Sequence, residues 1–227
     1  MLNKMRWLCM TIGLFAPLAC NGPAPISPPA GFTNLFNGHD LTGWGYDGSG
    51  HWGAENDVLV YDGGGWQPYP NTVWERNLHT EKEYGDFILL IDWKIEKDGN
   101  SGIFLRAAPE TPNILVDKGY GTSASEVQVE IWDRTAVVYS SLHGSGGVVG
   151  YNSEERIPLR TADHPLGEWN HFEIRVEGDL VTVRLNDELV LDKYAADFQR
   201  PRGSIILQHH GSPLWFKNIY LKELKEQ

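Results

Sequence analysis

Polar and aromatic side chains recur at every second position in three segments, residues 102–106, 126–132 and 205–210. Successive side chains of a β-strand point to opposite faces, so each segment would carry these groups on one face. The groups are Phe104 and Arg106, then Glu126, Gln128, Glu130 and Trp132, then Ile206, Gln208 and His210. A sugar-binding site needs this mixture, because flat apolar surface packs against ring C–H groups while fixed polar groups bind hydroxyls. The alternative is a solvated sheet face, although lysine, which favours such faces, is absent from all three.

The elements that would position these groups are strands. From Gly31 onward no stretch of 11 or more residues has a helical period, whereas alternation with a period of two recurs. The expected strands span residues 58–61, 87–96, 102–107, 126–132, 204–210 and 214–221, and residues 171–177, 180–185 and 189–191 form an antiparallel meander. With no crossover helices, the pattern predicts an all-β fold of antiparallel sheets packed face to face in one domain over residues 31–227. His209 and His210 are adjacent, so one of them would point inward.

The composition narrows the classes of function. The 227 residues carry a formal net charge of −11, which disfavours nucleic acid as a partner and raises no objection to a neutral sugar. Both cysteines, Cys9 and Cys20, lie near the start, so no disulfide can join the strands of the domain. Nine tryptophans are many for this length, and each would fill the core or line a binding site.

Residues 1–19 are typical of a signal peptide. Lys4 and Arg6 precede a short apolar run, which is shorter than the roughly 20 residues that a membrane span needs. The run ends at Cys20, and a cysteine directly after the cleavage point is typical of bacterial lipoproteins. We therefore expect lipidation at Cys20 and an exported protein that is anchored to the outer membrane or lies in the periplasm. Plain secretion is the alternative, since Pro17 stands where such signals carry an aliphatic residue. Residues 20–30 are rich in proline and would form an extended tether.

Short motifs follow one another along nearly the whole chain after residue 31. They are FTNLFNGHDLTGW at 32–44, YGDF at 84–87, NSGIFLR at 100–106, EVQ at 126–128, GEWN at 167–170, QHHG at 208–211 and FKNI at 216–219. Their order and content resemble the 3-keto-disaccharide hydrolase family, also described as 3-keto-glucoside 1,2-lyase/2-hydroxy-glucal hydratase. Segments 107–125 and 137–151 follow the family pattern least, and substrate choice would be set there.

The resemblance implies a concanavalin A-like jelly-roll β-sandwich of two antiparallel sheets. It also implies an exported enzyme that cleaves glycosides already oxidised at C3, with an oxidised (3-keto) glycoside or oligosaccharide as its partner and with membrane contact only through a lipid anchor. The identity of the oxidoreductase that makes the ketone stays open. Two other functions fit the same face: a carbohydrate-binding module without catalysis, and a conventional glycoside hydrolase on the same sandwich.

Cleavage of a 3-keto-glycoside needs a base for the C2 hydrogen, a group that stabilises the enolate oxygen and an acid for the leaving oxygen. For these roles the candidates are His210 or Glu126 as the base and Arg106 as the enolate stabiliser. The candidate substrate-binding residues are Asn100, Gln128, Gln208 and Glu130, with Trp132 or Trp44 as a stacking platform. A divalent metal held by Glu126, Gln128 or Glu130 with His210 is an alternative to Arg106, because a metal also polarises a carbonyl.

Overall fold

The computed structural model describes residues 27–45, 51–64, 77–108, 127–135, 144–148 and 157–225. All elements within these ranges are β-strands. The strands are β1 (Thr33–Asn34), β2 (Trp44–Gly45), β3 (Trp52–Glu55), β4 (Val58–Tyr61), β5 (Leu78–Thr80), β6 (Phe87–Ile95), β7 (Asn100–Ala107), β8 (Val127–Trp132), β9 (Asn170–Glu177), β10 (Leu180–Leu185), β11 (Glu188–Ala195), β12 (Ser204–Leu207) and β13 (Leu214–Glu223). The fold is therefore all-β, as the sequence predicted.

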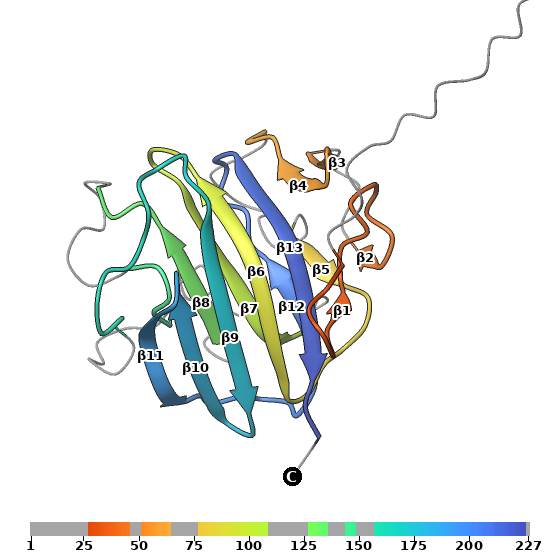
Figure 1. Ribbon diagram of the computed structural model, residues 1–227, viewed down its shortest axis with the longest axis vertical. Coiled ribbons are helices and arrows are strands. Elements are labelled where there is room, and N and C mark those ends of the chain that lie inside the picture. Colours follow the sequence, from red (N-terminus) through yellow and green to blue (C-terminus); the bar gives the residue numbers. More distant parts are fainter. Residues whose placement is uncertain are drawn as a thin grey trace, which may run out of the picture.

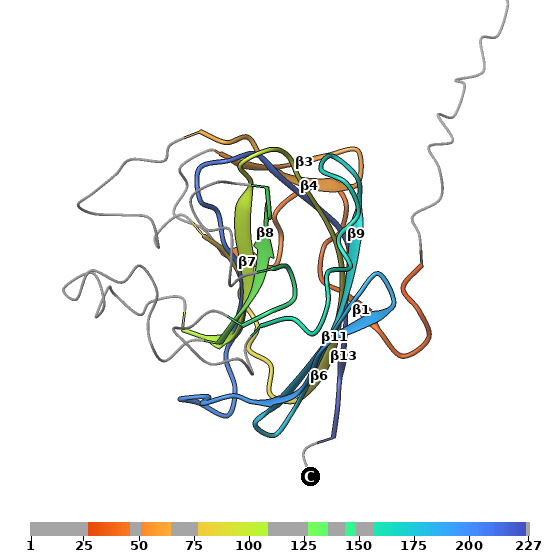
Figure 2. The ribbon, with the colours of Figure 1, turned by 90° about the vertical axis from the view of Figure 1, so that its left-hand side faces the viewer.

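The strands form two antiparallel sheets that lie as two layers (Figures 1 and 2). The larger sheet has eight strands in the order β11-β10-β9-β6-β13-β4-β3, with β1 paired to β13. The smaller sheet has five strands in the order β2-β5-β12-β7-β8. Two face-to-face antiparallel sheets of this kind form a jelly-roll β-sandwich, which confirms the predicted fold class.

Alternating side chains build the core between the layers. In β6 every odd-numbered residue from Phe87 to Ile95 is buried, and every even-numbered one is partly exposed. The smaller sheet contributes Ile103 and Leu105 from β7, together with Val129 and Ile131 from β8. Burying a side chain of this size stabilises the fold by roughly 2 kcal/mol. The two sheets are thus held together by one continuous apolar layer.

Most of the predicted strands are confirmed. The meander of β9, β10 and β11 is present, with Glu177 paired to Leu180 at the first turn and Leu185 to Glu188 at the second. The strand predicted over 204–210 is shorter and ends at Leu207. The strands β1, β2, β3 and β5 were not predicted; each has only two to four residues, which leaves little alternation to detect.

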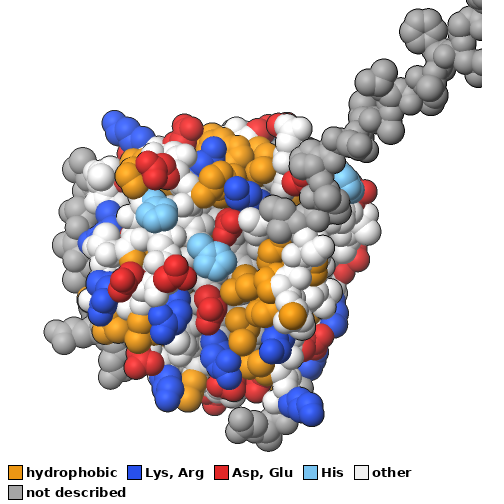
Figure 3. Space-filling view, viewed as in Figure 1, with side chains coloured by type: hydrophobic (Ala, Val, Ile, Leu, Met, Phe, Trp, Pro, Cys, Tyr) orange, Lys and Arg blue, Asp and Glu red, His pale blue; other side chains and the backbone are white. Residues whose placement is uncertain are grey.

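The outer face of the larger sheet is ionic and solvated. Figure 3 looks onto this face, where positive and negative side chains are interspersed. Asp92 Oδ1 lies 2.6 Å from His171 Nδ1. The Lys94 ammonium lies 4.3 Å from the ring centre of Trp215. Lysines and ion pairs mark this surface as the ordinary solvent side of the sandwich.

The predictions for the start of the chain lie outside the described residues. These are the signal peptide over 1–19, lipidation at Cys20 and most of the tether over 20–30. Within the described ranges, we find no helical segment with the length and hydropathy that crossing a bilayer would require.

Candidate functional site

The outer face of the smaller sheet differs from that of the larger one, because three of its polar side chains, Gln128, Glu130 and Gln208, are buried. We call it the small-sheet face, and its described residues are His79, Asn100, Gly102, Phe104, Gln128, Glu130, Ile206 and Gln208. Gln128 is 1% exposed and Glu130 is 7% exposed, although both point away from the core. Buried polar groups outside a core cost free energy unless they are paired or serve a ligand.

Strand pairing brings the residues of this face together in rows. Ile206 of β12 is paired with Phe104 of β7, and Phe104 is paired with Gln128 of β8. In the next row Gly102 is paired with Glu130, and the backbone N–H of Gln208 donates to the Gly102 carbonyl at 2.9 Å. Phe104 and Ile206 pack together in a small apolar cluster that is separate from the main core. The face therefore combines an apolar floor with amide and carboxyl groups.

A side-chain hydrogen bond crosses the centre of the face. Gln128 Nε2 donates to Gln208 Oε1 at 2.7 Å. The Gln128 side chain reaches across Gly102, where a Cβ atom would lie only 2.0 Å from Gln128 Nε2. The Gln208 backbone is held in turn by the Ser101 hydroxyl, which donates to its carbonyl at 2.7 Å. The missing side chain at Gly102 is thus what allows the two amides to meet.

Glu130 has the strongest electrostatic perturbation of this face. Burial raises the pKa of Glu130 from its ordinary 4.5 to about 8, because a charged carboxylate loses its hydration there. Its Oε2 atom is buried without a hydrogen-bond partner, as is Oε1 of Gln128. A carboxyl group in this state is protonated at neutral pH and can donate a hydrogen bond or a proton to a ligand. Buried groups with strongly shifted pKa values are common at functional sites.

One of the two adjacent histidines, His209, lies inward, as predicted. His209 is buried and stacks on Tyr61 of the core, with ring centres 4.4 Å apart. His210 is partly exposed and follows Gln208 and His209, beyond the end of β12 at Leu207. Burial lowers the pKa of His210, so its imidazole is neutral at pH 7. A neutral imidazole can accept a proton.

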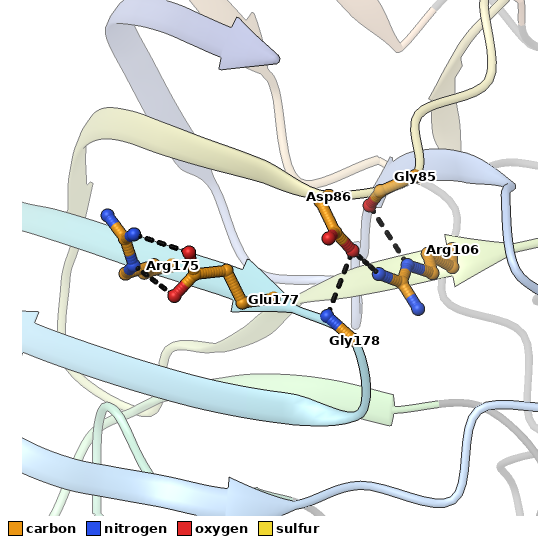
Figure 4. A network of polar contacts seen from close by, with 6 residues as sticks. All are labelled: Gly85, Asp86, Arg106, Arg175, Glu177 and Gly178. Atoms are coloured by element: carbon orange, nitrogen blue, oxygen red, sulfur yellow. Dashed lines mark hydrogen bonds and ion pairs between the residues drawn. The ribbon is translucent and has the colours of Figure 1, made fainter. Parts of the chain in front are cut away.

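Arg106 does not join this face, contrary to the prediction that it shares a side with Phe104. A bulge interrupts the pairing of β7 with β12, and Arg106 has a left-handed φ of 50° there. Its guanidinium donates to the Gly85 carbonyl at 2.9 Å and to Asp86 Oδ1 at 2.6 Å (Figure 4). Ala107, rather than Arg106, clusters with Phe104. Arg106 thus ties the smaller sheet to the start of β6 in the larger one.

The other candidate residues lie in different parts of the molecule. Trp44 lies in the core and donates its indole N–H to the Leu35 carbonyl at 2.8 Å, which argues against a stacking role. Asn100 is paired with Trp132 at the far end of the small-sheet face. Glu126 lies outside the described residues.

Two residues of the face were missed or undervalued by the sequence reasoning. His79 of β5 is paired with Ile206, which puts it on the same side. Gly102 was noted only as part of a motif, although a glycine inside a strand is a signal for close approach of another group. The signal for His79 was weaker, because its strand has only three residues.

The small-sheet face offers part of a donor set for a metal. The buried Gln128 Oε1 and Glu130 Oε2 lack partners, and such oxygens are ligands for hard divalent cations. No group of three or more His, Cys, Asp or Glu side chains able to hold a metal occurs within the described ranges. The described residues therefore do not complete a metal site by themselves.

The fold and this face define an all-β sandwich with a buried polar site on the outside of its smaller sheet. The sequence pattern of a family described as the 3-keto-alpha-glucoside-1,2-lyase-like domain matches residues 31–222. The match spans most of the chain, so the chain belongs to this family, as the motifs predicted.

Individual relatives agree with this assignment. A curated 3-keto-disaccharide hydrolase of Bacteroides thetaiotaomicron is 27% identical over 232 residues, covering 86% of this chain and 79% of the relative. Two solved structures from Parabacteroides distasonis, each named a "putative glycosyl hydrolase", are 24% and 22% identical, with TM-scores of 0.61 and 0.64. The first match covers 86% of this chain and 95% of that protein, and the second covers 85% and 99%. At this identity the two structures support the fold alone.

Proposed function

We propose that this chain cleaves 3-keto-glycosides by elimination followed by hydration, with the small-sheet face as its active site. The observation that carries the proposal is Glu130, a buried carboxyl group with a pKa of about 8 and an unpartnered Oε2, beside the Gln128–Gln208 pair. The name of the family and that of its curated relative point to the same class of oxidised sugar.

The first half of the reaction is an elimination. The ketone at C3 acidifies the hydrogen on C2, and His210, neutral at pH 7, removes it as the base. The electron pair forms an enolate whose oxygen accepts a hydrogen bond from the protonated Glu130. The enolate then re-forms the ketone, a C1–C2 double bond appears, and the C1–O bond breaks. The leaving oxygen takes the Glu130 proton and departs as an alcohol.

The second half is a hydration. After the elimination His210 carries the C2 proton, and Glu130 is a carboxylate. Glu130 accepts a proton from water as the water oxygen adds to C1, and His210 returns its proton to C2. The net result is hydrolysis of the glycosidic bond, with both side chains returned to their starting states. Glu126 is the alternative candidate for the base that removes the C2 hydrogen.

In this proposal Glu130 replaces Arg106 as the group that stabilises the enolate. Arg106 is already committed to Asp86 and Gly85, whereas a neutral carboxyl group can donate to the oxygen without a buried positive charge. Gln128, Gln208 and Asn100 would hold sugar hydroxyls above the apolar floor. In an alternative to the protonated carboxyl group, a divalent cation held by Gln128 Oε1 and a deprotonated Glu130 would polarise the C3 carbonyl.

A conventional glycosidase fits the described face less well. Such an enzyme uses a pair of carboxyl groups on either side of the scissile bond. At the described strand positions of this face, Glu130 is the one carboxyl group, and its neighbours Gln128 and Gln208 are amides. Two amides and a single acid suit hydroxyl binding plus one proton transfer.

The test compares a nitrophenyl glucoside with its 3-keto derivative, each with and without a chelator. Release of nitrophenol from the keto form alone supports the proposal. Equal release from both would mean a conventional glycosidase, and binding without release would mean a carbohydrate-binding module. Loss of activity on chelation, restored by a divalent cation, would assign the metal a part in the reaction.

We also propose that the protein works outside the cytoplasm, lipidated at Cys20. The support is the sequence of residues 1–30 alone. Metabolic labelling with a palmitate analogue tests it, with Cys20→Ser as the variant that should lose the label and Cys9→Ser as the matched control that should keep it.

A further inference from the structure

A cavity of about 190 Å³ opens at the end of the sandwich where β6 and β8 finish and β9 begins. We call it the end cavity. Its lining residues are Trp93, Ile95, Trp132, Asp133, Arg134, Thr135, Thr161, Asp163, His164, Leu166 and Asn170. Trp93 and Ile95 are core-facing residues of the larger sheet, so the cavity enters between the two layers. It meets the end of the small-sheet face at Trp132, which is paired with Asn100, but none of the residues that define that face lines the cavity.

Two polar atoms of the end cavity are buried without a hydrogen-bond partner. One is the indole Nε1 of Trp93, a residue only 1% exposed, and the other is Oδ2 of Asp163. Trp93 Nε1–H can only donate a hydrogen bond, and a carboxyl oxygen can accept one. Leaving either group buried and unpaired costs free energy. Because both residues line the end cavity, a small shift of their side chains on binding would let one ligand pair with both atoms.

The segment that carries Asp163 is held by a partly buried network of hydrogen bonds. The backbone N–H of His164 donates to Asn170 Oδ1 at 2.8 Å. Asn186 Nδ2 donates to the Ala162 carbonyl at 2.7 Å and to Asn170 Oδ1 at 2.8 Å. The residues on both sides of Asp163 are thus anchored to the larger sheet. This anchoring holds the carboxyl group in place before any ligand arrives, which lowers the entropic cost of binding.

The mouth of the end cavity is accessible and partly apolar. Thr161 and His164 are exposed, and Leu166 is 42% exposed, one of the few large hydrophobic side chains at the described surface. Inside, Trp93, Ile95 and Trp132 provide apolar walls. The cavity is smaller than the 300–1,000 Å³ typical of drug-sized ligands. Its ligand must therefore be compact, with an apolar face and hydroxyl groups at its edge.

We propose that the end cavity binds a single pyranose ring, as a second carbohydrate site separate from the small-sheet face. One ring hydroxyl accepts a hydrogen bond from Trp93 Nε1–H, and another donates to Asp163. The C–H face of the ring packs against the indole of Trp132. Asp133 and Arg134 place charges of both signs at the cavity, which suits a ligand without net charge.

The experiment follows the indole N–H signals of the full mature chain by NMR during titration with methyl glucoside. The Trp93 signal is assigned with Trp93→Phe. We expect it to shift in a saturable way, because the indole N–H gains an acceptor. A glucose disaccharide serves as a second probe, and tighter binding of it would show that the site takes the end of a chain rather than a free monosaccharide.

Two variants and a matched control locate the binding. Leu166→Tyr narrows the mouth and should abolish the shift, and Asp163→Ala should weaken binding about tenfold through the lost hydrogen bond. Leu180→Tyr is the control, since Leu180 is also 42% exposed but lies on β10, outside the cavity lining, and it should bind as the parent does.

Three results would overturn the inference. The first is no shift of the Trp93 signal up to the solubility limit of either sugar, which would leave water as the occupant. The second is an unchanged shift in Leu166→Tyr. The third is loss of the shift in Glu130→Gln, which would assign the sugar to the small-sheet face. The readout does not depend on catalysis, so it stands whether or not the proposed cleavage is observed.

Discussion

Gln128 on β8 and Gln208 after β12 are joined by a side-chain hydrogen bond of 2.7 Å that passes over Gly102 of the strand between them. The two amides are 80 residues apart in the chain. Each amide is thereby fixed in one orientation, with the carbonyl oxygen of Gln128 left without a partner. A fixed, unsatisfied acceptor beside the Glu130 carboxyl is suited to binding a sugar hydroxyl, and it makes Gly102 a positioning residue.

Gly102→Ala should impair function while leaving the fold intact. The new Cβ would lie 2.0 Å from Gln128 Nε2 and 2.8 Å from its Cγ, so the buried Gln128 must move and lose its hydrogen bond to Gln208, at a stability cost of about 1–3 kcal/mol. We expect at least a tenfold loss of kcat/KM on the 3-keto substrate, with an unchanged circular dichroism spectrum. Gly53→Ala is the matched control, since a Cβ there meets nothing within 4 Å. Parent-like kcat/KM in Gly102→Ala would remove the amide pair from the site.

The pH profile of kcat/KM should be bell-shaped. The base His210 must be unprotonated, and burial lowers its pKa below the ordinary 6.5, so activity falls only on the acid side of that value. The acid Glu130 must be protonated, so activity falls as the pH rises through about 8. In Glu130→Gln the alkaline limb should vanish along with most of the rate. An alkaline limb that persists in this variant would belong to another group.

Glu130→Gln should also stabilise the protein, in a pH-dependent way. Between pH 4.5 and about 8 the folded state keeps a proton that the unfolded chain has released, so stability falls as the pH rises. The penalty at pH 7 is about 3 kcal/mol, and the variant removes it. Chemical denaturation should therefore show a gain at pH 8 and little gain at pH 4.5. Glu55→Gln, at an exposed position, is the control and should leave the stability unchanged at both pH values. An equal effect of Glu130→Gln at both pH values would contradict the raised pKa.

Arg106→Met should destabilise the fold by about 3 kcal/mol, because it leaves a nearly buried carboxylate without its partner. The side chains of Arg106 and Asp86 are 4% and 12% exposed. Once folded, the variant should keep a parent-like kcat. The double variant Arg106→Met/Asp86→Asn should recover part of the lost stability, because no charge is then stranded. A collapse of kcat in well-folded Arg106→Met would restore the catalytic role first expected for this residue.

The residues differ in how far their roles could be predicted from the sequence. Alternation identified β6 to within one residue and put Gln128 and Gln208 on one face, because the side-chain period of a strand is a local property. The same reasoning failed for Arg106, since a one-residue bulge in β7 reverses the alternation and leaves no mark in residue types. Trp44 was expected to stack on sugar, but tryptophan serves cores and binding sites alike, and only packing distinguishes them.

The sequence by itself determined most of the longer strands, the all-β class and the family, since these depend on local periodicity and on motifs that lie in order along the chain. The tertiary structure decided which polar groups became reactive. The pKa of Glu130 depends on desolvation by atoms from elsewhere in the chain, and the end cavity joins Trp93, Trp132 and Asp163 from three separate stretches. The burial of a side chain depends on the packing of the whole molecule, so residue types along a short stretch of sequence could not predict it.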